Sequence, residues 1–230
     1  CQMNVSDSER VASVLVSKGY EMTSDESAAD VVLINTCSVR EKAENKLYSR
    51  VGEIRKSRGN SPMIGVLGCV AQLEGETLFR KSPGVDFVIG TKAVGRVADA
   101  IEKVSDGASD FVDLGDREFD YDWSVGSKQR HSPYVSFIPI IEGCNKFCTY
   151  CIVPFSRGRE KSLPASVIVE QVQRLKADGV KEVHLIGQNV NSYRPQSDAG
   201  LEGFRGTTPF ARLLRSVAAT PSHAVTSFPR

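Results

Sequence analysis

The sequence has no long apolar run and no excess of charge of either sign. No stretch approaches the roughly 18 consecutive apolar residues that a membrane-spanning helix needs, and no basic and then apolar segment opens the chain, as it would in a signal peptide. With 29 Lys and Arg residues against 28 Asp and Glu residues, the net charge is only +1. Nucleic-acid binding would therefore need a local patch. We expect a cytoplasmic protein that does not enter a membrane.

Histidine is scarce, at three in 230 residues, whereas cysteine occurs six times. The cysteines are Cys1, Cys37, Cys69, Cys144, Cys148 and Cys151. An even number allows disulfides, but a long chain in a reducing compartment keeps its thiols free. We therefore favour metal binding or catalysis over a disulfide framework.

The two ends of the sequence indicate a piece of a longer protein. The first residue is a cysteine rather than an initiator methionine, and the chain stops within the apolar run AVTSFPR. The 40% hydrophobic and 25% charged residues suffice for one large core or two smaller ones. We expect one or two folded domains, truncated at both ends.

Residues 1–104 alternate between short apolar runs and helical patterns. The first helical pattern has Ser6 and Asp7 as candidate caps, followed by Val11 and Leu15 at helical spacing. The β-branched runs are 29–37, 62–69 and 85–91, and the helical patterns that follow them are 39–59, 70–84 and 92–104. This alternation predicts an α/β fold with a doubly wound parallel sheet.

Cysteines recur at the ends of the predicted strands. Cys37 and Cys69 each follow an apolar run, and Cys1 precedes a helix, so we expect it to follow a strand as well. The carboxyl ends of parallel strands share one edge, where ligands bind, so three thiols can converge there. Taken singly, Cys37 and Cys69 are equally compatible with small buried apolar side chains. Their repeated placement favours a shared site.

Residues 105–133 break the periodicity and carry an excess of acidic residues. Among them are Asp110, Asp113, Asp116, Glu118, Asp120 and Asp122. Their spacing matches no calcium-binding loop. We expect a linker that Phe119 and Trp123 pin to a domain, followed by a second domain over residues 134–230 that opens with the apolar strand PYVSFIPII.

The stretch GCNKFCTYCIVP, residues 143–154, places Cys144, Cys148 and Cys151 in a single loop. Structural zinc usually has four protein ligands, commonly in two Cys-x-x-Cys pairs. Here no fourth ligand is close, since His131 lies 13 residues before the first of these cysteines and beyond a predicted strand. Three thiolates suit an iron–sulfur cluster whose fourth iron binds an exchangeable group. We favour such a cluster over zinc.

These residues carry a resemblance to a known family. The three cysteines, with Tyr150 before the last, resemble the hallmark of the radical S-adenosylmethionine (SAM) superfamily. The strings CQMN, NTCSVREKAENK, GVLGCVAQ, GCNKFCTYCIVPFSRGRE and EVHLIGQNVNSY together are similar to the methylthiotransferases, most closely the MiaB branch that modifies tRNA. The similarity covers nearly the whole chain and is more specific than a three-cysteine motif alone.

The resemblance implies a fold and a set of cofactors. Residues 1–104 would form a methylthiotransferase domain with an auxiliary 4Fe-4S cluster on Cys1, Cys37 and Cys69. Residues 134–230 would form the first half of a radical-SAM partial (β/α) barrel, with a second 4Fe-4S cluster on Cys144, Cys148 and Cys151. S-adenosyl-L-methionine would bind the open iron of the second cluster.

The resemblance also implies a reaction and its partners. Sulfur insertion and methyl transfer at C2 of an N6-isopentenyl adenosine next to the anticodon would give a 2-methylthio product. The partners implied are tRNA, an electron donor such as flavodoxin or ferredoxin, and a sulfur donor. We expect a monomer.

Further residues are candidates for contacts with SAM or substrate. They are Tyr150, Arg157, Arg159, Gln188, Asn189 and Asn191. The resemblance places Tyr150 near the SAM adenine, the alternative being packing within the loop. Arg157 and Arg159 could bind carboxylate or phosphate oxygens, which suit guanidinium groups. The alternative is that both lie in a solvated basic turn. The amides lie beyond a strand's carboxyl end, where barrels gather their sites, although asparagine also forms turns.

Other functions remain open at this point. Sister branches act on threonylcarbamoyl adenosine in tRNA or on an aspartate of a ribosomal protein. A different class is a non-catalytic iron–sulfur or zinc module that only recognises RNA. Such a module would bind RNA without cleaving SAM.

Overall fold

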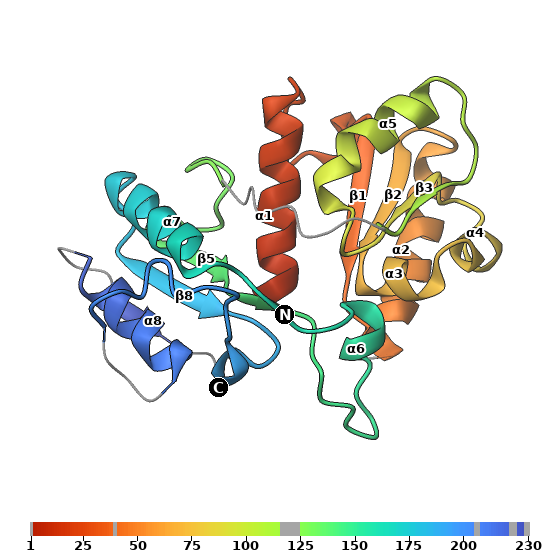
Figure 1. Ribbon diagram of the computed structural model, residues 1–230. Coiled ribbons are helices and arrows are strands. Elements are labelled where there is room, and N and C mark those ends of the chain that lie inside the picture. Colours follow the sequence, from red (N-terminus) through yellow and green to blue (C-terminus); the bar gives the residue numbers. More distant parts are fainter. Residues whose placement is uncertain (1, 39–40, 116–124, 205–207, 221–224, 228–230) are drawn as a thin grey trace.

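The chain folds into two α/β units (Figure 1). The computed structural model describes residues 2–38, 41–115, 125–204, 208–220 and 225–227. Cys1, Phe119 and Trp123 lie outside the described residues. Among the described residues, no helix is long and apolar enough to span a bilayer.

The first unit is built on a four-stranded sheet. Its strands are β1 (Val31–Thr36), β2 (Met63–Gly68), β3 (Phe87–Ile89) and β4 (Phe111–Asp113). They lie side by side in the order β1-β2-β3-β4, and each neighbouring pair is parallel. The predicted parallel sheet is confirmed.

Helices cover both faces of this sheet. They are α1 (Gln2–Ser17), α2 (Glu41–Arg58), α3 (Cys69–Glu74), α4 (Thr77–Lys81) and α5 (Val97–Ser105). Leu15 of α1 and Ile101 of α5 pack with Phe87 in one core. Leu47 of α2 packs with Val66 in a second core on the other face.

Two local expectations for the first unit are wrong. Ser6 and Asp7 are not helix caps, because α1 begins at Gln2 and both side chains are buried within it. Cap preferences are local signals, whereas the buried face of this helix continues back to Met3. The segment expected to be a linker also contains β4, which completes the sheet and includes Asp113.

The second unit is built on a three-stranded parallel sheet in the order β5-β8-β9. Its elements are β5 (Val135–Pro139), β6 (Ile141–Glu142), α6 (Val153–Ser156), β7 (Lys161–Ser162), α7 (Ala165–Ala177), β8 (Glu182–Ile186), α8 (Pro209–Ala218) and β9 (Val225–Ser227). Ile138, Leu185 and Leu213 pack in its core. These successive βα units match the expected first part of a barrel.

The two units meet at the edges that carry the cysteines. Cys37 directly follows β1, and Cys69 directly follows β2 as the first residue of α3. The loop with the other cysteines runs from β6 to α6, and α6 lies beside α3 (Figure 1). The fold therefore brings both predicted sites to the junction between the units.

Candidate functional site

The first pair of thiols lies at the ends of neighbouring strands. Thr36 at the end of β1 is in register with Gly68 at the end of β2, so Cys37 and Cys69 follow at the same level of the sheet. Gly68 has φ +92°, and a Cβ atom there would lie 2.3 Å from Oδ1 of Asn35. Only glycine fits this close approach of the two strand ends.

The start of α1 is held at the same edge. The Asn4 side chain donates a hydrogen bond of 3.1 Å to Oδ1 of Asn35, whose amide donates in return to the carbonyl oxygen of Asn4 at 2.9 Å. Asn35 lies two residues before Cys37. Cys1 itself is outside the described residues, so its predicted role as a third ligand stays a prediction.

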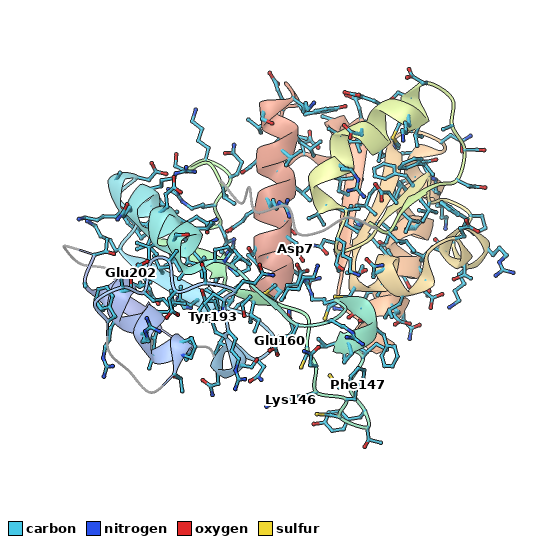
Figure 2. The ribbon with its side chains drawn as sticks, viewed as in Figure 1. Asp7, Lys146, Phe147, Glu160, Tyr193 and Glu202 are labelled. Carbon is cyan, nitrogen blue, oxygen red and sulfur yellow. The ribbon has the colours of Figure 1, made fainter. Side chains whose placement is uncertain are left out.

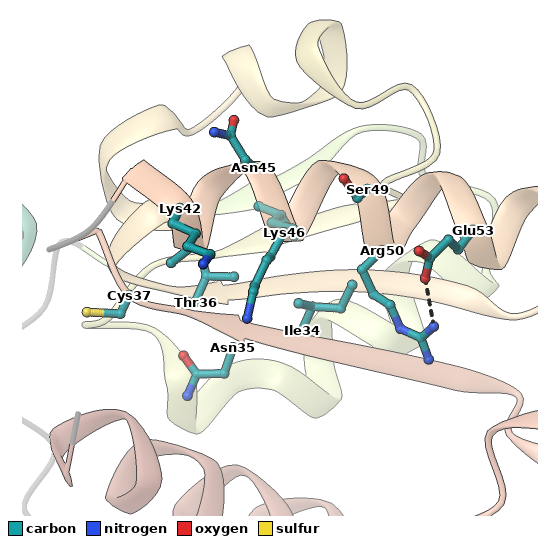
Figure 3. A pocket seen from close by; sticks show the side chains of 12 residues that line it. Ile34, Asn35, Thr36, Cys37, Lys42, Asn45, Lys46, Ser49, Arg50 and Glu53 are labelled. Atoms are coloured by element: carbon teal, nitrogen blue, oxygen red, sulfur yellow. Dashed lines mark hydrogen bonds and ion pairs between the residues drawn. The ribbon is translucent and has the colours of Figure 1, made fainter.

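A pocket of about 590 Å³ opens beside Cys37 (Figure 3). Its walls are the end of β1 and the first turns of α2, and they include Thr36, Lys42 and Lys46. Both lysines are exposed. The pocket therefore combines a thiol with positive charge on its outer side.

The second group of thiols lies on the loop between β6 and α6. Cys144 is buried, Cys151 is half-buried and Cys148 is exposed, and all three are free thiols. Figure 2 shows Lys146 and Phe147 at the outer part of this loop, away from both sheets. Tyr150 is 94% exposed, so it is not packed within the loop.

The thiols of the loop are not gathered around one point in this conformation. Among the described residues, no three His, Cys, Asp or Glu side chains lie close enough together to hold a metal ion. The donor set nevertheless fits an iron–sulfur cluster, because residues 143–152 contain three free thiols and no histidine or carboxylate that would favour zinc or a harder cation. The ligand roles of Cys144, Cys148 and Cys151 stay predictions.

The base of the loop is tightly closed. The Cys144 N–H donates to the carbonyl oxygen of Gly158 at 3.1 Å. Gly143 has φ +77°, and a Cβ atom there would lie 2.3 Å from the carbonyl oxygen of Arg159. The two ends of the loop therefore approach each other more closely than a side chain at Gly143 would allow.

The predicted amide cluster lies beside this loop. Gln188 and Asn189 are half-buried and Asn191 is exposed. Ser192 donates a hydrogen bond of 2.6 Å to Glu160, which connects the turn after β8 to the end of the cysteine loop. Oε1 of Gln188 is buried and has no hydrogen-bond partner among the described residues. An acceptor of this kind is suited to a ligand that donates a hydrogen bond.

The two arginines after the loop have different surroundings. Arg159 is exposed, as expected for a contact with a ligand. Arg157 lies neither in a solvated turn nor free to bind SAM, because only 3% of its side chain is exposed and its guanidinium bonds Asp7 at 2.6 Å and Glu142 at 3.2 Å. Two buried carboxyl groups of the protein itself therefore already pair with this guanidinium.

Sequence reasoning missed these buried partners. Asp7 lies 150 residues from Arg157 along the chain, and Glu142 precedes the cysteine loop. One signal was present, because Asp7 shares a helical face with the apolar residues Val11 and Leu15. A charged residue on a buried face requires a partner.

Burial raises the pKa of the Glu142 carboxyl from its ordinary value of 4.5 to about 7, although Arg157 acts to lower it. Between these values the folded protein keeps a proton that the unfolded chain releases. The contribution of Glu142 to stability is therefore complete below about pH 4.5 and is lost as the pH rises through about 7.

Changing Glu142 to glutamine removes this titration. The free energy of unfolding of the wild type should fall relative to that of E142Q as the pH rises. The difference between the two proteins is expected to shift by about 2 kcal/mol in favour of E142Q from pH 5 to pH 7.5. Urea unfolding of both metal-free proteins at the two pH values measures this change. A stability difference that stays constant with pH would contradict the assignment.

Two family models match the chain. Residues 1–90 match the Uncharacterized protein family UPF0004, and residues 138–203 match the Radical SAM superfamily. The second range contains the cysteine loop and the amide cluster.

Three similar curated proteins are each named tRNA-2-methylthio-N(6)-dimethylallyladenosine synthase. They come from Koribacter versatilis, Novosphingobium aromaticivorans and Agrobacterium fabrum, and each is 40% identical to this chain. The alignments cover 94%, 97% and 100% of this chain and 47%, 51% and 52% of the relatives. The chain thus spans about half the length of the curated relatives it matches.

Two similar solved structures are of the radical S-adenosylmethionine methyltransferase TsrM from Kitasatospora setae, one with tryptophan substrate and a SAM analogue and one with cobalamin and a [4Fe-4S] cluster. Their TM-scores are 0.55 and 0.52 at 12% and 13% identity. They cover 81% and 80% of this chain, and 45% and 46% of their own chains are aligned. At this identity the likeness supports the predicted fold alone. Together, the cysteine pattern, the two family models and the 40% identical relatives support a MiaB-like methylthiotransferase of the radical SAM superfamily, of which this chain spans about half.

Proposed function

We propose that this chain carries the two cluster sites and the SAM site of a tRNA methylthiotransferase that forms 2-methylthio-N6-isopentenyladenosine next to the anticodon. The observation that carries the proposal is the placement of two separate thiol groups, Cys37 with Cys69 and the Cys144 loop, at one junction between the units. The names of the 40% identical relatives support the substrate.

The loop residues would hold a 4Fe-4S cluster through Cys144, Cys148 and Cys151, and Cys37 and Cys69 would hold a second one together with Cys1. The cluster on Cys144, Cys148 and Cys151 would supply the reductive cleavage of SAM, with the electron coming from the electron donor. The tight base at Gly143 fixes the backbone of Cys144, while the exposed position of Cys148 leaves it free to turn toward a ligand.

The remaining residues would bind SAM and substrate. Tyr150, with its ring in solvent, can stack on an adenine. The unpaired Oε1 of Gln188 can accept a hydrogen bond from an amino group, and Asn189 and Asn191 offer further amides on the same turn. Arg159 can pair with a carboxylate or a phosphate.

A single-stranded RNA loop is the substrate class that this surface suits. The loop carries the exposed rings of Phe147 and Tyr150 together with the exposed Lys146, and Lys161 on β7 is exposed as well. Aromatic rings and basic side chains on one surface bind splayed bases and phosphates. An electron donor such as flavodoxin or ferredoxin and a sulfur donor complete the proposed set of partners. The alternatives are threonylcarbamoyl adenosine in tRNA and a ribosomal-protein aspartate.

Mass spectrometry of tRNA from cells that lack the gene tests the substrate. The expected result is loss of 2-methylthio-N6-isopentenyladenosine with accumulation of N6-isopentenyladenosine, and restoration of the product when the gene is returned. If the cells instead lose a methylthiolated threonylcarbamoyl adenosine, that nucleoside is the substrate. If their tRNA is unchanged and a ribosomal protein lacks its modification, the substrate is the aspartate of that protein. RNA binding without SAM cleavage by the purified protein would indicate a recognition module instead.

A further inference from the structure

Arg157 joins both units at a buried point between the two thiol sites. Its side chain and that of Asp7 on α1 are 3% and 2% exposed, and Nη2 of Arg157 donates to Oδ2 of Asp7 at 2.6 Å. Nη1 donates to Oε1 of Glu142 on β6 at 3.2 Å. Figure 2 shows Asp7 at the end of α1 that faces the cysteine loop.

The residues on either side of Arg157 make the same junction. Thr91, just after β3, donates its hydroxyl to the carbonyl oxygen of Ser156 at 2.9 Å, and both groups are buried. Gly158 accepts the N–H of Cys144. Three consecutive residues, 156–158, therefore bond the strand-end edge of the first unit, the start of α1 and the first cysteine of the loop.

The contacts of Arg157 also extend to the other thiols. Nη2 lies 3.4 Å from Oδ1 of Asn4, and Asn4 in turn holds Asn35, two residues before Cys37. Although burial alone lowers the pKa of Arg157, Asp7, the Cys69 thiol and Glu142 together raise it above its usual value. Cys69 also lies near this residue in the fold, because it begins α3, which packs against α6, the helix that ends directly before Arg157.

Only an arginine can make this set of contacts. Its planar fork presents several N–H donors in fixed directions, whereas a lysine ammonium is a point charge that cannot span both Asp7 and Glu142 in the same way. Breaking a buried ion pair is costly because it leaves one partner with an uncompensated charge. Arg157, Asp7 and Glu142 are therefore held in one defined geometry.

We propose that Arg157 is a positioning residue that sets the separation and orientation of the Cys37–Cys69 edge relative to the Cys144 loop. The consequence of this positioning for transfer of the methylthio group to the substrate rests on the proposed function. The geometric part does not, because it concerns the protein's own thiols and can be measured without metal.

Alkylation of the metal-free, reduced full chain tests the geometric part. Iodoacetamide labelling is followed at each cysteine by mass spectrometry in the wild type, R157K, D7N and R96K. Cys69 is only 5% exposed, and we expect R157K to raise its labelling rate about tenfold through local opening of the junction. Cys148 is already exposed and should change by less than about twofold.

R96K is the matched control. Arg96 pairs with Asp113 through two bonds of 2.6 Å, but both residues belong to the first unit. This variant should leave Cys69 at its wild-type rate. If the circular dichroism of R157K shows that this variant is not folded, the labelling rate of Cys69 in D7N is used instead. D7N removes the negative charge that pairs with Arg157 and keeps the size of the Asp7 side chain. If Cys69 is labelled at the wild-type rate in a folded R157K or D7N protein, the proposal is wrong.

A second readout separates positioning from a general loss of stability. With clusters reconstituted and dithionite as the one-electron reductant, we expect R157K to keep SAM cleavage to methionine and 5′-deoxyadenosine but to form about a hundredfold less methylthiolated product for each deoxyadenosine. If R157K forms as much methylthiolated product for each 5′-deoxyadenosine as the wild type does, Arg157 has no role in transfer of the methylthio group. If the wild type forms no methylthiolated product, the proposed function fails, while the labelling result still decides the geometry.

Discussion

Replacing Cys144, Cys148 and Cys151 together by alanine is expected to lower the iron content of the anaerobically reconstituted protein from about eight to about four atoms per chain and to abolish SAM cleavage. The reason is that the thiolates are the only strong donors in residues 143–152. Without them, no iron remains next to the proposed SAM site. Iron analysis, together with chromatography of 5′-deoxyadenosine, measures both effects.

The complementary variant is the control for this result. Changing Cys37 and Cys69 to alanine should also remove about four irons, but it should leave SAM cleavage intact and abolish only the methylthiolated product. Loss of cleavage in both variants to the same extent would contradict two independent sites. A wild-type protein that takes up zinc and no iron would contradict the cluster proposal as a whole.

Local periodicity was enough to predict the fold and the placement of two thiols. The β-branched runs before Cys37 and Cys69 form neighbouring parallel strands, so the register of Thr36 with Gly68 follows the expected strand-end rule. Such predictions depend only on contacts within each segment and on the common direction of parallel strands.

The roles of buried charges were not predictable in the same way. Arg157 reads as a basic turn residue after the cysteine loop, and Asp7 reads as a helix cap. Their pairing depends on the docking of two units, and no periodic signal encodes a contact across 150 residues. A buried carboxylate on a helix face shows that a partner exists without identifying it.

The strand-end thiols and the loop thiols thus depend on different parts of the structure. Cys69 is placed by the sheet, since it begins α3 at the end of β2. Cys144 is placed by the backbone at the base of its loop, through its bond to Gly158 and the close approach at Gly143. A change at Gly143 should therefore affect one site and spare the other.

Changing Gly143 to alanine is expected to destabilise the metal-free protein by about 3 kcal/mol. Part of the loss is the strain of a side chain at φ +77°, and the rest is the contact of the new Cβ atom, 2.3 Å from the carbonyl oxygen of Arg159. Relieving this contact moves the backbone of Cys144. We therefore also expect G143A to take up about four fewer irons on reconstitution, as the triple cysteine variant does.

Gly179 separates the two causes. It has φ +84°, and a Cβ atom there meets nothing within 4 Å, so G179A carries the strain without the close contact. It should cost only about 1 kcal/mol and should keep the wild-type iron content. Urea unfolding and iron analysis of both variants make the comparison. If G143A and G179A lose the same stability and bind the same iron, the close approach at the base of the loop does not position Cys144.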